Sequence, residues 1–216
     1  MPQNLALITG ASRGLGAALA EALALNGWHV VAVARTTGGL EDLDDRVKAQ
    51  NAAGALTLAP MDITNDDAMR HLCLSIHQRW GGVQLWVHAA IHAAPLSPAS
   101  SLDTKDWDKS LAINLRATGQ LIPMIDPLLR AGKGTALFFD DPRSGQKFFG
   151  AYGASKAAQI ALARSWQAET ITIGPRVLIE TPAPMPTATR ARFFPGEDRT
   201  PLASPHDEAA RLLALL

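Results

Sequence analysis

The chain has 216 residues with 20 basic and 20 acidic side chains, so its formal net charge is zero. This balance argues against a partner that is a nucleic acid or an anionic membrane, because such binders need an excess of positive charge. A single cysteine, Cys73, excludes an internal disulfide, and no cysteine–histidine cluster indicates a metal site. The uncharged side chains of residues 1–4 and the absence of an apolar run of ~20 residues indicate a soluble, cytoplasmic protein.

Short apolar runs alternate with segments of helical spacing along most of the chain, whose length fits one domain over residues 1–216. The apolar runs predict strands at residues 5–9, 28–34, 55–60, 83–90, 135–139 and 176–180. The spacing predicts helices at residues 14–26, 39–52, 65–79, 104–131, 151–170 and 205–216. Expected N-caps are Thr64 and either Asp103 or Thr104.

The predicted strands are apolar nearly throughout, which is typical of a parallel sheet whose two faces are both covered by helices. The alternation of strands and helices therefore predicts an α/β fold with a doubly wound parallel sheet of about six strands, a Rossmann fold. Residues 182–204 interrupt the alternation with prolines set among arginines and phenylalanines. We expect an irregular segment that acts as a lid over the substrate.

The strongest local motif is the glycine-rich stretch from Thr9 to Gly16, between the first predicted strand and helix. Gly10 allows a sharp turn, Gly14 removes a side chain where a pyrophosphate approaches, and Gly16 allows the helix to pack on the strand. The amide groups at the helix N-terminus are then available to a phosphate. The alternative is a glycine-rich turn that binds nothing, although the strand–turn–helix context favours a dinucleotide.

The spacing G-x-x-x-G-x-G resembles the opening T-G-x-x-x-G-x-G motif of the short-chain dehydrogenase/reductase family, and the resemblance extends over nearly the whole chain. It implies a nicotinamide dinucleotide cofactor and hydride transfer between a carbonyl and an alcohol. In the turn, it implies cofactor contacts from Ser12, Arg13 and Leu15 besides the glycines. Elsewhere it implies such contacts from Asp62 and Ile63 near the adenine and from Ala89, Pro182, Met185 and Thr187 near the nicotinamide.

The residues after the second strand indicate NADP(H) rather than NAD. Arg35 and Thr36 stand where an NAD site would carry a carboxylate for the ribose diol, and the first acid, Glu41, comes six residues after Arg35. The guanidinium groups of Arg35 and Arg13 are suited to charge-assisted bonds with a ribose phosphate. The alternative is that both arginines are solvated surface residues.

Tyr152 and Lys156 lie four residues apart, on one face of the predicted helix 151–170. An adjacent ammonium lowers the pKa of a phenol, so Tyr152 is a candidate acid/base for the oxygen of the reacting bond. The resemblance implies that Lys156 also binds the nicotinamide ribose and that Asn114 holds a relay water. The alternatives are a half-buried tyrosine beside a surface lysine, and a buried asparagine bonded to a backbone carbonyl.

Three departures from the family pattern concern activity and assembly. His88 and Ala89 begin the stretch that replaces the N-N-A-G motif, and we expect His88 to be a core histidine. Asp141 occupies the place of the family's serine, where an ionised carboxylate cannot donate a hydrogen bond and raises the pKa of the tyrosine. Ser144 is a possible substitute, a protonated Asp141 is another, and loss of the usual reaction is the third.

The chain closes with the helical run 205–216, without the final strand of the family, so the resemblance implies a dimer rather than a tetramer. The expected interface uses helices 104–131 and 151–170. Two hypotheses of function follow. The first is an NADP(H)-dependent oxidoreductase for a small carbonyl or alcohol, with Tyr152, Lys156, Asn114 and Asp141 at the reacting end. The second is a dinucleotide-binding sensor or partner protein with little turnover.

Overall fold

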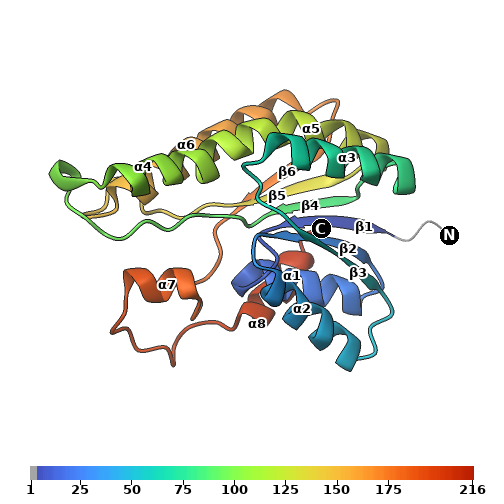
Figure 1. Ribbon diagram of the computed structural model, residues 1–216, viewed down its shortest axis with the longest axis horizontal. Coiled ribbons are helices and arrows are strands. Elements are labelled where there is room, and N and C mark those ends of the chain that lie inside the picture. The colour runs from blue at the N-terminus through green and yellow to red at the C-terminus, as the bar shows by residue number, and fades with distance from the viewer. Residues whose placement is uncertain (1–3) are drawn as a thin grey trace.

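The computed structural model describes residues 4–216, which fold around one parallel sheet of six strands. The strand order is β3-β2-β1-β4-β5-β6, so the chain leaves the centre of the sheet in one direction and then in the other. This is the doubly wound topology that the alternating sequence pattern predicts, and Figure 1 shows the strands side by side. The strands are β1 (Leu5–Thr9), β2 (His29–Ala34), β3 (Ala55–Pro60), β4 (Leu85–His88), β5 (Thr135–Phe139) and β6 (Arg176–Glu180).

Helices cover both faces of the sheet (Figure 1). One face carries α3 (Asp66–Trp80), α4 (Thr104–Ser110), α5 (Ala117–Gly132) and α6 (Gly150–Glu169). The other carries α1 (Gly14–Leu25), α2 (Thr37–Ala49) and α8 (Pro205–Leu213), while α7 (Ala188–Phe193) lies beyond the end of the sheet. A short 3-10 turn at Ala99–Ser101 precedes α4.

The core has two layers because successive side chains of a strand point to opposite faces. In β1, Leu5 and Leu7 pack beneath α3, α5 and α6, whereas Ala6 and Ile8 pack beneath α1. The same alternation holds in β5, where Phe138 joins the first layer and Phe139 the second. These fully apolar strands are therefore buried on both sides.

Four predicted strands have the observed bounds, whereas the predicted strands 28–34 and 83–90 are shorter in the structure; the other errors concern the helices and connecting segments. The cap of α3 is Asn65, whose side-chain oxygen accepts a hydrogen bond from the amide of Ala68, so the prediction of Thr64 was wrong. The hydroxyl of Thr64 instead donates to Asp62. Asp103 caps α4, which decides between the two residues predicted there. The irregular segment 182–204 contains helix α7, which the sequence did not indicate.

The predicted helix 104–131 is interrupted by a π-helical stretch, Leu111–Arg116, between α4 and α5. A π-helical turn contains an extra residue, which rotates the side chains that follow it. Asn114 lies within this stretch and is fully buried. Its amide oxygen accepts from the backbone N–H of His92 at 2.7 Å, and its amide nitrogen donates to the carbonyl of His92 and to the hydroxyl of Ser155. The interruption thus ties the loop after β4 to α6.

Helix α8 is fastened to the loop that follows β6. The buried carboxylate of Glu208 accepts a hydrogen bond from the amide of Ala183 at 3.2 Å and is also bound by Arg211. The amide of Ala203 donates to the carbonyl of Pro184. These contacts hold residues 181–187 against the lower helical layer, at the end of the sheet where β6 finishes.

Within residues 4–216, every helix is too short or too polar to pass through a lipid bilayer. Across the same residues, no group of three or more metal-ligating side chains gathers in one place.

Candidate functional site

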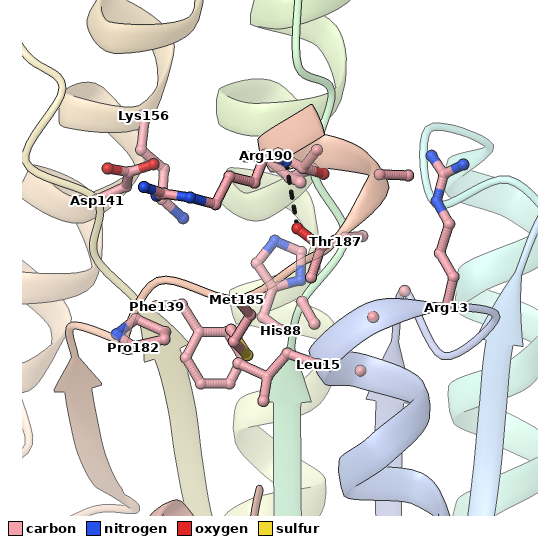
Figure 2. A pocket seen from close by; sticks show the side chains of 18 of the residues that line it. Arg13, Leu15, His88, Phe139, Asp141, Lys156, Pro182, Met185, Thr187 and Arg190 are labelled. Atoms are coloured by element: carbon pink, nitrogen blue, oxygen red, sulfur yellow. Dashed lines mark hydrogen bonds between the residues drawn. The ribbon is translucent and has the colours of Figure 1, made fainter. Parts of the chain in front are cut away.

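A cleft of about 420 Å³ opens at the carboxyl ends of the strands, where the chain changes direction between β1 and β4. Ligands of doubly wound folds bind at this position. Its lining includes all but one of the predicted site residues, namely Gly10, Ser12, Arg13, Gly14, Leu15, Gly16, Arg35, Thr36, Asp62, Ile63, Ala89, Asp141, Tyr152, Lys156, Pro182, Met185 and Thr187. Figure 2 shows Arg13 at one end of the cleft and Asp141 and Lys156 at the other.

The turn between β1 and α1 needs glycine for steric reasons. Gly10 has a φ of +90°, and a Cβ there would lie 2.5 Å from the amide nitrogen of Ala90. A Cβ on Gly16 would lie 2.2 Å from the carbonyl oxygen of Gly10. Gly14 has a φ of +57°, and a Cβ there would lie 3.3 Å from Cγ2 of Thr187. Two of the first three residues of α1, Gly14 and Gly16, therefore carry no side chain, which leaves room for a pyrophosphate to approach the amides there.

Two exposed arginines stand at the end of the cleft beyond this turn. Arg35 follows β2, and one of its guanidinium nitrogens lies 3.8 Å from a carboxylate oxygen of Asp62. The other oxygen of Asp62 accepts hydrogen bonds from the amide and hydroxyl of Thr64. Arg13, which precedes α1, is exposed and points along the opening in Figure 2. Ile63, beside Asp62, adds a buried apolar side chain to the lining. This end of the cleft thus offers two guanidinium groups to an anion.

Tyr152 is buried, and its hydroxyl donates a hydrogen bond of 2.9 Å to Asp141 Oδ2. The other oxygen, Oδ1, lies 3.1 Å from Nε of Arg143. Ser144 is exposed and does not line the cleft, so Asp141 rather than Ser144 faces the tyrosine. Burial and the negative charge of Asp141 both raise the pKa of Tyr152 above that of a free phenol. The phenol therefore keeps its proton at neutral pH.

Lys156 lies one helical turn from Tyr152, and its ammonium donates to Oε1 of Gln159 at 2.7 Å. Burial lowers the pKa of Lys156 to about 8, although the charges of Asp141 and Asp140 oppose this shift. The ammonium is therefore only partly retained a little above neutral pH. Gln159 in turn donates to the hydroxyl of Thr118 at 3.0 Å.

His88 continues this buried polar chain at the end of β4. One ring nitrogen lies 2.9 Å from the hydroxyl of Thr118, and the other lies 2.7 Å from the hydroxyl of Thr9. Burial, with a contribution from the charge of Lys156, lowers the pKa of His88 to about 3, so its ring is neutral. His88 is thus the core histidine that the sequence predicts, with two side-chain partners.

Asn114 is the predicted site residue that does not line the cleft. Its amide is engaged by the backbone of His92 and by Ser155, and no hydrogen bond joins it to Lys156 or Tyr152. Its side-chain amide therefore links the loop after β4 to helix α6. The relay water that the resemblance implies for Asn114 stays a prediction.

Helix α7 packs over Tyr152. The ring of Phe193 lies 4.8 Å from that of Tyr152 and 5.0 Å from that of Phe149, centroid to centroid. Thr187 begins this helix, since its hydroxyl accepts a hydrogen bond from the amide of Arg190 (Figure 2). The segment that carries Pro182, Met185 and Thr187 thus forms one wall of the cleft and leads directly into its cover.

Two contributors to the site, Arg143 and Gln159, escaped sequence reasoning, whereas Phe193 and Arg190 lie in the segment 182–204 that was predicted to act as a lid. Gln159 lies three residues after Lys156, so the helical spacing carried a signal that the sequence analysis did not use. Arg143 follows Asp141 by two residues, but nothing in the sequence indicates that its side chain turns back. Phe193 and Arg190 belong to a helix that the proline content concealed.

The chain matches the family model described as short chain dehydrogenase over residues 4–198. An uncharacterised oxidoreductase of Mycobacterium bovis is 31% identical over 198 residues, which cover 87% of this chain and 58% of that protein. The chain thus spans little more than half the length of this relative. A short-chain dehydrogenase structure from Pseudomonas syringae has a TM-score of 0.88 at 27% identity, covering 96% of this chain and 87% of that one.

A second solved structure, a short-chain dehydrogenase of Shigella flexneri in complex with NADP, has a TM-score of 0.85 at 25% identity. The match covers 95% of this chain and 88% of the Shigella flexneri chain. The family match over most of the chain agrees with the doubly wound sheet, the glycine turn and the paired tyrosine and lysine. The chain therefore belongs to the short-chain dehydrogenase/reductase family.

Proposed function

We propose that the chain is an NADP(H)-dependent oxidoreductase that transfers a hydride between the nicotinamide and a small substrate, with Tyr152 as the proton donor or acceptor. The supporting observation is one continuous cleft that has a glycine-rich helix N-terminus and two guanidinium groups at one end and Tyr152 and Lys156 at the other. A carbonyl and alcohol pair is the reaction that the family resemblance implies. Bound NADPH supplies the hydride, and the protein supplies the proton.

The residues along the cleft fit this cofactor. The glycine-rich first turn of α1 is suited to the pyrophosphate because it offers backbone amides and the positive end of the helix dipole. Arg13 and Arg35 would bind the ribose phosphate, with Thr36 beside them and with Asp62 and Ile63 at the adenine. Ser12 and Leu15 would contact the pyrophosphate side. The nicotinamide would be held by Ala89, Pro182, Met185, Thr187 and Lys156.

At the reacting end, each residue has a distinct proposed role. Tyr152 is held as a neutral phenol, the form that can give a proton to the substrate. Asp141 fixes the direction of the phenol hydroxyl, and Lys156 places a positive charge on the same helix face. Asn114 holds the loop after β4 in place rather than contacting substrate. Phe193 covers the phenol and limits access of water to it.

We also propose a homodimer formed through helices α4, α5 and α6, the segments that the sequence analysis assigned to an interface. These helices form one outer layer of the molecule, on the side away from α8 (Figure 1). Size-exclusion chromatography with light scattering distinguishes a dimer from a monomer. A charge introduced at exposed Gln120 on α5 should convert a dimer into a monomer if this layer is the interface.

Cofactor choice is tested by titrating the protein with NADPH and with NADH while following nucleotide fluorescence. The double variant Arg13→Ala/Arg35→Ala should bind NADPH about 10 to 100 times more weakly and NADH nearly unchanged, because only NADPH carries the extra phosphate. Arg176→Ala, which removes an exposed arginine at the start of β6, is the matched control. Equal affinity of the wild type for both nucleotides would refute the assignment of the two arginines.

The bond between Tyr152 and Asp141 also favours a second candidate, a dinucleotide-binding protein with little turnover. A phenol that donates to a carboxylate must exchange this partner for the substrate before it can act. A panel of aldehydes, ketones and quinones, assayed for NADPH oxidation with wild type and Tyr152→Phe, separates the two candidates. Turnover that disappears in the variant supports the enzyme, and tight NADPH binding without turnover supports the sensor.

A further inference from the structure

The reacting end of the cleft presents hydrogen-bond acceptors where a carbonyl oxygen would require donors. An ionised carboxylate offers about four acceptor positions and no donor. In Asp141, one position is used by Tyr152 and one by Arg143, so further positions stay open toward the cleft that this residue lines. The proton of Tyr152 is also committed to Asp141. A carbonyl oxygen entering here would meet the lone pairs of a carboxylate.

Neighbouring contacts fix the position of Asp141. Its backbone amide donates to Oδ1 of Asp140 at 2.8 Å, and the second oxygen of Asp140 lies 3.2 Å from a guanidinium nitrogen of Arg164. The guanidinium of Arg143 also stacks over the rings of Phe149 and Phe194, which fixes it beside Asp141. The carboxyl group of Asp141 is therefore held in one orientation at this end of the cleft.

We propose that the substrate reacts at a carbon–nitrogen double bond whose nitrogen is protonated, and that Asp141 binds this N–H group. The inference rests on the hydride transfer of the proposed function, but it replaces the carbonyl and alcohol pair by an imine and amine pair. In this reaction Tyr152 holds Asp141 in place and does not supply the proton. A protonated imine is cationic and donates a hydrogen bond, so it complements a carboxylate where a carbonyl oxygen is repelled. The same contact favours the protonated imine, which accepts a hydride far more readily than the neutral one.

The reaction adds a hydride from the dihydronicotinamide to the carbon of the C=N bond. The π electrons of that bond move to the nitrogen, whose N–H proton is retained, so one C–H bond forms and the product is a neutral amine. NADPH is oxidised to NADP⁺ and the imine is reduced. The amine product keeps the N–H proton that the protonated imine brought with it. Neither Asp141 nor Tyr152 therefore gains or loses a proton over one turnover.

The surface beside Tyr152 indicates what the C=N group is attached to. Phe193 and Phe194 line the cleft on the side of α7, and Ile91 lines it from the loop after β4. These side chains pack in one apolar cluster with Tyr152. A flat ring next to the reacting carbon fits this wall, because aromatic side chains favour stacked and edge-on contacts with other rings. Bicyclic aromatic compounds are therefore suitable probes of this inference.

The first test measures binding rather than turnover. Calorimetry on the NADP⁺-saturated protein compares tetrahydroisoquinoline, which is an ammonium at pH 7, with alpha-tetralol, a neutral alcohol of similar shape. We expect the ammonium to bind at least about tenfold more tightly, and Asp141→Asn to weaken the ammonium about tenfold while leaving the alcohol unchanged or tighter. Equal binding of both probes to the wild type would overturn the inference, whatever the variant does.

The second test compares the substrates themselves. NADPH oxidation with dihydroisoquinoline should exceed that with alpha-tetralone by at least about tenfold, and Asp141→Ser should reverse or abolish this preference. A preference for the ketone in the wild type would overturn the inference. The cofactor titration described above separates the two levels: tight NADPH binding with a ketone preference removes only the imine proposal, whereas failure to bind either nucleotide removes the oxidoreductase proposal as well.

Discussion

The two halves of the sheet build their parts of the cleft in different ways. Between β1 and β3, the cleft is shaped by the backbone, because Gly10 and Gly16 leave no space for a Cβ. Between β4 and β6, it is shaped by side chains that bind one another, such as Tyr152 with Asp141 and Lys156 with Gln159. A steric requirement admits few residue types, whereas a hydrogen-bonded pair can be exchanged for another. The half between β1 and β3 therefore follows the family pattern, and the departures lie between β4 and β6.

The largest expected effect is in the backbone half. Gly16→Val should destabilise the protein by roughly 3 kcal/mol or more and abolish NADPH binding, because a Cβ there would lie 2.2 Å from the carbonyl of Gly10. Urea unfolding and nucleotide fluorescence measure the two effects. Gly38→Ala is the matched control, since a Cβ at this exposed position in α2 meets nothing within 4 Å. Stability of Gly16→Val equal to that of the control would show that the turn relaxes.

A second prediction concerns the side-chain half and uses the fact that Tyr152 is the only tyrosine in the chain. Asp141→Asn should lower the pKa of Tyr152, because it removes a negative charge and an ionic acceptor from the phenol. The near-ultraviolet absorbance of phenolate follows this titration without interference from other tyrosines. We expect about tenfold or more phenolate in the variant at any pH at which both proteins stay folded.

Asp140→Asn is the control for this titration, because Asp140 raises the pKa of Tyr152 less than Asp141 does. It should shift the titration in the same direction by a smaller amount. Identical curves for the wild type and Asp141→Asn would contradict the view that Asp141 holds the phenol in its protonated form.

The smallest expected effect concerns Lys156, whose pKa burial lowers from 10.5 to about 8. Between these two pH values the unfolded chain holds a proton that the folded chain has released, so this residue makes the protein more stable as the pH rises. Lys156→Met should be more stable than the wild type at pH 7, and the difference should shrink by roughly 1 kcal/mol between pH 8 and pH 9.

Urea unfolding at the two pH values measures this change. Lys105→Met, at an exposed position in α4, is the control for loss of a lysine side chain without burial. A difference in stability that stays constant from pH 8 to pH 9 would mean that Lys156 keeps its charge in the folded protein.

How much the sequence could predict depended on whether the determining contacts are local. Apolar runs such as 5–9 and 135–139 match the strands residue by residue, because burial on both faces leaves a continuous signal. The contact between His88 and Thr118 joins segments far apart in the chain, so the sequence does not show it. The contact between Arg143 and Asp141 depends on the rotamer of the arginine. Helix α7 was missed because the surrounding prolines suggested an irregular segment, although Thr187 is an ordinary N-cap.

A label on helix α8 can report movements of the loop 181–187, although the label itself lies outside that loop. Glu208 fastens this helix to Ala183, so a displacement of the loop on ligand entry pulls on the helix. The native thiol of Cys73 is buried and has a pKa raised to about 11, which makes it unreactive toward alkylating dyes. A cysteine introduced at exposed Ala210 would therefore take up a fluorophore selectively, and its emission would follow coenzyme binding in real time.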